Sequence, residues 1–123
     1  PVENPLSIVA AETAYTKGHV WLADLTAYLD ANFQYLKEQL DLHLPETDFV
    51  IPEATYLAWV NVGHYFKSDE NLTLFFARNA GVLLEGGNMF VANADGYIRL
   101  NLACPRARLE EGLRRVIAAI REQ

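Results

Sequence analysis

Residues 97–106, YIRLNLACPR, contain the pattern that decides the fold. Aliphatic side chains alternate with other residues here, and they stand at Ile98, Leu100 and Leu102. A period of two is typical of a strand with one buried face, so we expect a strand over residues 97–103. Arg99 then lies on the opposite face of that strand. Pro105 favours the first turn of a helix, where its missing N–H is not needed, so the strand leads directly into a helix.

Four segments have the spacing or the caps of helices. Asn4 is a favourable N-cap for a short helix over residues 5–17, and Gly18 ends this helix. A longer helix over residues 20–42 has one apolar stripe. Ser68 and the acids after it are predicted to cap a third helix. The helix that begins at Pro105 has an apolar stripe of its own, formed by Leu109, Leu113, Val116, Ile117 and Ile120.

Strand patterns fill most of the chain between these helices. Residues 56–62, YLAWVNV, are apolar on both faces for most of their length, which indicates a strand that is covered on both sides or lies inside a sheet. We also predict shorter strands over residues 48–51 and 82–84. The order is two helices, two strands, a helix, two strands and a helix. This order predicts an α+β fold, with a mainly antiparallel sheet covered by helices and a long helix leading into it.

Composition argues against several classes of function. The net charge is −6, from 16 acidic and 10 basic residues, whereas nucleic-acid-binding proteins usually present a basic surface. No apolar run approaches the roughly 18 residues of a membrane span. Cys104 is the only cysteine, which excludes an intrachain disulfide framework and suits the cytoplasm. The histidines show no metal-ligand spacing, so no metal site is expected; they are His19, His43 and His64.

Arg99 is the residue whose surroundings most suggest a site. A guanidinium is a planar fork that matches a carboxylate bidentately, and a strand would hold that fork rigidly. The alternative is an arginine on a solvent-facing sheet surface that pairs with an aspartate or a glutamate, which is the commoner place for this side chain. Cys104 is either a nucleophile or a small residue buried at the end of a strand. The residues alone show no complete catalytic site.

Several stretches together resemble the C-terminal part of fold-type I enzymes that use pyridoxal phosphate (PLP), in the class I/II aminotransferase superfamily. Within it they are most similar to the MalY/PatB branch of cystathionine β-lyases and related C–S lyases. The resemblance covers essentially the whole chain. It is carried by residues 4–7 (NPLS), 21–22 (WL), 52–59 (PEATYLAW), 81–82 (GV), 87–90 (GNMF) and 99–106 (RLNLACPR).

The resemblance implies particular roles for residues of this chain. In such enzymes the matching strand arginine, here Arg99, binds the α-carboxylate of the amino-acid substrate. Asn101 lies on the same face and is expected to support it. Ala54 and Thr55 match a turn near the substrate entrance, so Thr55 is a candidate substrate-binding residue. Arg106 is expected to be a structural residue at the start of the last helix.

The resemblance also implies a domain organisation. Residues 1–44 correspond to a helical connector from a large PLP-binding domain, and residues 45–123 to the small C-terminal domain. PLP chemistry needs a lysine for the Schiff base, and none of Lys17, Lys37 and Lys67 matches it. The chain has no initiator methionine, so we expect a piece of a longer homodimeric enzyme. This chain would contain no catalytic residue and would be inactive alone.

Two other hypotheses remain open from the sequence. In the first, the chain is a stand-alone α+β module that binds amino acids or dimerises, with Arg99 as an anchor and without catalysis. In the second, it is a structural interaction domain in which Arg99 makes an ordinary ion pair. Variants of Arg99 distinguish these hypotheses from the enzyme, because lysine keeps the charge but loses the bidentate fork.

Overall fold

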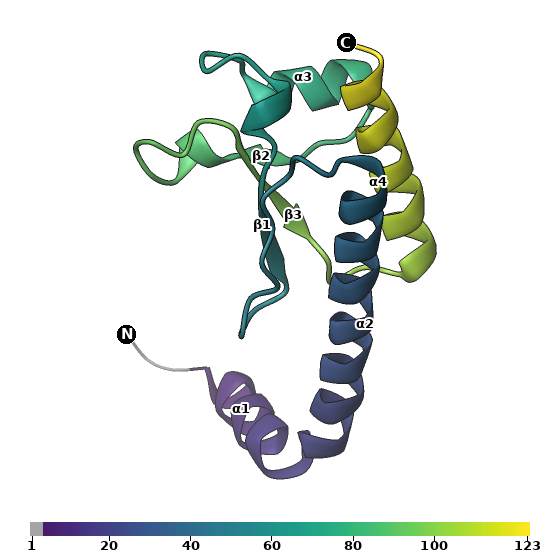
Figure 1. Cartoon of the computed structure of the whole chain (residues 1–123). Helices are drawn as coiled ribbons and strands as arrows, with labels where there is room; N and C mark the ends of the chain where they lie inside the picture. Colours follow the sequence, from purple (N-terminus) through teal and green to yellow (C-terminus); the bar gives the residue numbers. More distant parts are fainter. Residues whose placement is uncertain (1–3) are drawn as a thin grey trace. The chain divides into compact units, whose positions relative to one another are not determined.

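The structure is a computed structural model that describes residues 4–123. It has the predicted α+β class (Figure 1). The chain forms two compact units, one reaching to Ala31 and the other comprising Asn32–Gln123. The division falls inside a helix, and the functional division at residues 44 and 45 stays a prediction. The elements are α1 (Pro5–Lys17), α2 (His19–His43), β1 (Leu57–Asn61), η1 (Gly63–Tyr65), α3 (Leu72–Asn79), β2 (Glu85–Gly86), η2 (Gly87–Met89), β3 (Tyr97–Asn101) and α4 (Arg106–Arg121).

The first unit contains α1 and the beginning of α2. The side chain of Asn4 accepts a hydrogen bond from the backbone N–H of Leu6 at 2.9 Å, and Pro5 is the first helical residue. The N–H of Gly18 donates to the carbonyl of Ala14 and closes the last turn. The predicted start and end of this helix are therefore confirmed. No described residue of α1 is buried.

The second unit is built on a three-stranded antiparallel sheet in the order β1-β3-β2. β3 is the central strand, so the interior position expected for residues 56–62 is wrong: β1 is at an edge of these three strands, and its residues alternate between buried and half-buried. The alternation in residues 97–103 predicts β3 as a strand, although its ladder ends at Asn101. Arg99 stands directly between Trp59 of β1 and Glu85 of β2 in the register. Because side chains opposite each other in a sheet point to the same face, these three lie together.

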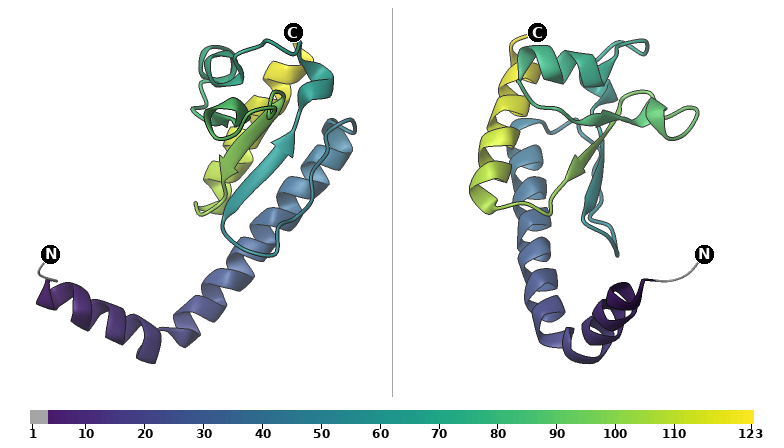
Figure 2. Two further views of the ribbon diagram at one scale, coloured as in Figure 1. Left: turned by 90° about the vertical axis from the view of Figure 1, so that its left-hand side faces the viewer. Right: turned by 180° about the vertical axis from the view of Figure 1, so that it is seen from behind.

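The core lies between the sheet and two helices. Residues 32–43 of α2 and the whole of α4 pack beside each other on the face that carries Ile98 (Figures 1 and 2). α3 adds Phe76, whose ring meets Phe66 and Phe75 edge-on. The predicted stripe of α4 is confirmed, since its members are all buried: Leu109, Leu113, Val116, Ile117 and Ile120.

One buried polar side chain joins α2 to the end of the sheet. Asn32 is 0% exposed, and its Nδ2 donates to the carbonyls of Leu102 at 2.9 Å and Cys104 at 3.3 Å. These carbonyls lie on the connection from β3 to α4. A buried polar group is costly without a partner, so these bonds hold the connection in one position. They keep Arg99 and α4 in a defined arrangement.

Three local predictions are wrong in detail. Residues 48–51 form no strand, and their part in the sheet is an isolated bridge between Asp48 and Asn61. The cap of α3 is Asn71, which accepts from the N–H of Leu74 at 3.1 Å, and not Ser68. Residues 82–84 form no strand, and the short strand β2 comes directly after them at Glu85–Gly86. The strand propensity of a segment favours an extended backbone, whereas its pairing depends on which other backbone lies beside that segment.

Glu111 on α4 gives the structure a dependence on acid pH. It accepts hydrogen bonds from Arg114 and Arg115, and these lower its pKa from 4.5 to about 2. The ion pairs therefore stabilise the fold fully above pH 4.5, and this stabilisation is lost as the pH falls towards 2. We expect Glu111→Gln to lower the thermal midpoint slightly at neutral pH, by a difference that disappears in strong acid.

Thermal unfolding followed by circular dichroism between neutral and strongly acid pH measures this difference. Glu110→Gln is the matched control, because Glu110 is a neighbouring exposed acid on α4 for which the structure gives no ion pair within residues 4–123. The ion pairs would not act as described if the difference in thermal midpoint between Glu111→Gln and the unchanged chain stayed constant down to the lowest pH.

Candidate functional site

The guanidinium of Arg99 is held by one edge and one face. Its Nε lies 2.9 Å from Oε2 of Glu85, and its Nη2 also donates to that oxygen. Its Cζ lies 4.0 Å from the centre of the Phe90 ring, which is a cation–π distance. The side chain of Arg99 is 28% exposed and that of Glu85 44% exposed. The group is therefore oriented by its neighbours and still reachable from solvent.

Aromatic side chains surround this pair on the same face of the sheet. The ring of Trp59 stacks on Tyr97 with centroids 5.5 Å apart and meets Phe90 edge-on at 6.0 Å. We call Trp59, Glu85, Phe90, Tyr97 and Arg99 the Arg99 cluster. Aromatic faces exclude water from one side of a charge and strengthen its interactions with an incoming anion.

A groove of about 610 Å³ adjoins the Arg99 cluster. It is bounded by residues 82–85, by the end of β3 and by the first half of α4. Arg99 and Asn101 both line it, so the structure brings together two of the three candidate substrate-binding residues. Arg108 and Cys104 line it as well, which adds a second positive charge and a thiol.

Asn101 is exposed, and its side chain already has one partner. Its Oδ1 accepts a hydrogen bond from the N–H of Ala103 at 2.9 Å. This leaves the amide Nδ2, a donor, for a ligand in the groove. The predicted supporting role of Asn101 is compatible with this arrangement and stays a prediction.

Thr55 lies outside the lining of this groove, although Leu57 is part of it. The backbone of Thr55 has a φ of +73°, in the left-handed region that a β-branched residue rarely adopts. Its hydroxyl accepts from the N–H of Leu57 at 3.2 Å and closes the turn before β1. Such strained positions are frequent at functional sites, but the substrate-binding role of Thr55 stays a prediction.

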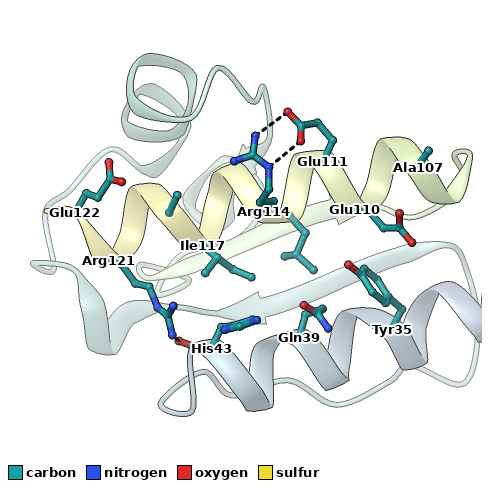
Figure 3. A pocket seen from close by; sticks show the side chains of 12 residues that line it. Tyr35, Gln39, His43, Ala107, Glu110, Glu111, Arg114, Ile117, Arg121 and Glu122 are labelled. Carbon is teal, nitrogen blue, oxygen red and sulfur yellow. Dashed lines mark hydrogen bonds and ion pairs between the residues drawn. The ribbon is translucent and has the colours of Figure 1, made fainter.

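A second groove, of about 670 Å³, lies between α2 and α4 (Figure 3). Its arginines already have partners: Arg114 binds Glu111, and Nη2 of Arg121 donates to the carbonyl of His43 at 3.2 Å. Arg106 begins α4 and lies over the ring of Tyr35 at 4.6 Å, which agrees with a structural role at the helix start. The groove beside Arg99 is the better candidate for binding an anion.

The described residues were also compared with the requirements of a metal site and of a membrane-spanning helix. Within residues 4–123 the structure has no group of three or more His, Cys, Asp or Glu side chains placed to hold a metal ion. None of the helices in that same part of the chain is long and apolar enough to cross a membrane.

Sequence reasoning did not identify Glu85, Phe90 or Trp59 as neighbours of Arg99. Glu85 precedes a Gly-Gly pair and Phe90 ends the GNMF segment, but neither feature indicates a neighbour of Arg99. Their proximity depends on the register of β1 and β2 against β3. Alternation alone does not determine register, because it leaves open which residues are directly opposite.

Comparison with known proteins places the whole chain in one group. No protein-family model matches the sequence. The chain is 35% identical to the cystathionine beta-lyase PatB of Bacillus subtilis and 34% identical to the protein MalY of Escherichia coli. These alignments cover 95% and 94% of this chain and 30% of each relative.

A solved structure gives the same assignment. A PLP-bound C–S lyase from Staphylococcus hominis, in complex with the inhibitor L-cycloserine, matches with a TM-score of 0.95 and 49% identity. The match covers all of this chain and 33% of that one, so the chain spans about a third of the length of its relatives. PLP is the cofactor of this family. The chain therefore belongs to the PLP-dependent aminotransferase superfamily, as a counterpart of the C-terminal part of the MalY/PatB cystathionine beta-lyases and C–S lyases.

Proposed function

We propose that this chain is the substrate-carboxylate-binding domain of a PLP-dependent cystathionine beta-lyase (C–S lyase) or aminotransferase acting on amino acids. The whole protein would add a large PLP-binding domain from the same chain and would work as a cytoplasmic homodimer. The observation that carries the proposal is the position of Arg99 on the central strand, beside a groove and held on only one edge.

The positions of the lysines support the proposal that the Schiff-base residue is not among them. Lys37 pairs with Asp41 at 2.9 Å on α2, and Lys17 and Lys67 are exposed. None of the three lines the groove beside Arg99. In this proposal PLP is held covalently by a residue outside this chain, and the chain's own contribution is to bind and orient the substrate.

Arg99 would perform this binding through its free edge. A carboxylate placed against Nη1 and Nη2 would make two parallel charge-assisted hydrogen bonds. Two bonds fix the direction of the carboxylate as well as its distance, so the remaining atoms of the amino acid take one orientation relative to β3. Such positioning contributes to the rate of reaction as well as to affinity.

The alternative of a purely structural arginine is supported by one observation. Arg99 already pairs with Glu85, which is the arrangement expected of an ordinary ion pair on a sheet surface. Stand-alone binding of amino acids without catalysis also remains a candidate. Kinetic measurements on Arg99 variants distinguish these functions.

Light absorption tests the proposed division of labour. We expect the whole protein that contains this sequence to absorb visible light as a PLP Schiff base, and the band to shift when an amino acid is added. The 123-residue chain, incubated with PLP and then desalted, should retain no such band, because its lysines do not line the site. Stoichiometric PLP on the short chain, or none on the whole protein, would contradict the proposal.

A further inference from the structure

Glu85 leaves half of the Arg99 fork open. A guanidinium has a side edge, formed by Nε and one Nη, and an end edge, formed by both Nη atoms. Both bonds from Arg99 reach a single oxygen of Glu85, Oε2, and they come from Nε and Nη2. Within residues 4–123 the structure gives no partner to Nη1 of Arg99. The end edge is therefore open to a second carboxylate.

The short strand that carries Glu85 is itself held in place. Glu85 is directly opposite Arg99 in the β2–β3 ladder. The N–H of Gly86 donates to the hydroxyl of Thr73 on α3 at 2.9 Å. A Cβ at Gly87 would lie 2.5 Å from the carbonyl oxygen of Ala94, so only glycine allows this close approach of the backbone. Glu85 thus meets Arg99 from a fixed position.

Phe90 restrains the same guanidinium on a second side. Its ring covers one face of the group at 4.0 Å, while Glu85 takes the side edge. An arginine side chain has several rotatable bonds, and ordering them costs free energy when a ligand binds. A guanidinium that is oriented before binding avoids most of that cost.

We propose that Glu85 is a positioning residue that presents the end edge of Arg99 to the α-carboxylate of the substrate. This inference rests on the proposed function, because it gives Arg99 a substrate to bind. Glu85 is also negative and repels an incoming carboxylate. That repulsion acts across the guanidinium and through water, since Glu85 is 44% exposed, whereas its bonds to Arg99 act at contact. The orienting effect therefore outweighs the repulsion.

Two substitutions at Glu85 in the whole enzyme test the inference. We expect Glu85→Ala to raise the KM for the amino-acid substrate about ten-fold with kcat nearly unchanged, as is typical for the loss of an orienting partner. Glu85→Gln keeps an oxygen that accepts from Arg99 and should recover most of the loss. Neither variant should change the KM for the matching amino-acid amide, which has no carboxylate. Glu111→Gln, which removes an acid from the ion pairs of α4, is the matched control.

The outcomes separate this inference from the proposed function. If Arg99→Ala raises KM but Glu85→Ala leaves it unchanged or lowers it, Arg99 is the anchor and Glu85 does not position it. If Arg99→Ala leaves KM unchanged, the proposed carboxylate site fails and the inference fails with it. A rise in KM that is equal for the amino acid and its amide would show a general structural effect and would also overturn the inference.

Nuclear magnetic resonance of the 123-residue chain gives a readout that needs no activity. Hydrogen exchange of the Arg99 Nε–H with water should be slow in the unchanged chain and in Glu85→Gln, and faster in Glu85→Ala, because Nε donates to this side chain. Equal exchange in all three forms would contradict the positioning role.

Discussion

Replacing Arg99 with alanine is expected to raise the KM of the whole enzyme for its amino-acid substrate by about 10- to 100-fold, the equivalent of losing hydrogen bonds between charged groups. Arg99 is the arginine of the central strand, and it lines a groove. The KM of Arg99→Lys should lie between that of the unchanged enzyme and that of Arg99→Ala, because lysine keeps the positive charge but loses the planar fork. Steady-state kinetics with an amino acid and with its amide measure the effect, which should be confined to the substrate that has the carboxylate.

Arg115→Ala is the matched control for this experiment. Arg115 also pairs with a glutamate, Glu111, but on the exposed side of α4. It should leave the kinetic constants unchanged. If both Arg99 variants behave like Arg115→Ala, Arg99 is an ordinary structural partner of Glu85, and the hypothesis of a structural interaction domain is the better one.

Replacing Phe76 with alanine is expected to reduce the free energy of unfolding of the 123-residue chain by about 3–5 kcal/mol. Phe76 is 0% exposed, and its ring lies 5.1 Å from Phe75 and 5.7 Å from Phe66, centroid to centroid. Alanine would remove one member of this aromatic group and leave a cavity. Since domains are stable by only about 5–15 kcal/mol, much of the chain should unfold at mild denaturant concentrations.

Urea unfolding followed by circular dichroism measures this loss. Leu74→Ala is the matched control, because Leu74 is on the same helix and is 47% exposed. Its effect on the midpoint should be small, since most of its side chain is already in water. Equal midpoints for Phe76→Ala and Leu74→Ala would show that α3 does not pack into the core as described.

The elements that sequence predicted best are those whose pattern is local. The stripe of α4 repeats at helical spacing, and all of its predicted members are buried. Asn4 with Pro5 marks the start of α1, because both the cap and the proline act within one turn. The alternation around Ile98 predicted a strand and put Arg99 on its other face. Each of these features depends on neighbours within a few residues, so it is visible in the chain itself.

The features that sequence missed depend on distant partners. Residues 82–84 have a strand-like composition, yet the ladder with β3 begins only at Glu85. Asn71 and not Ser68 caps α3, because the helix begins where its buried face meets the core. Asn32 stands on an otherwise apolar stripe, and only the structure shows that it binds the carbonyls of Leu102 and Cys104.

The sequence by itself determined the α+β class, the position of Arg99 on a strand and, through the resemblance, the family and its cofactor. The tertiary structure alone decided what surrounds Arg99: Glu85 on its side edge, Phe90 on its face and a groove that the residue lines. The physical reason is the distance along the chain over which each feature is determined. Periodicity reports which face a side chain takes, whereas its partners follow from strand register and packing between residues far apart in the chain.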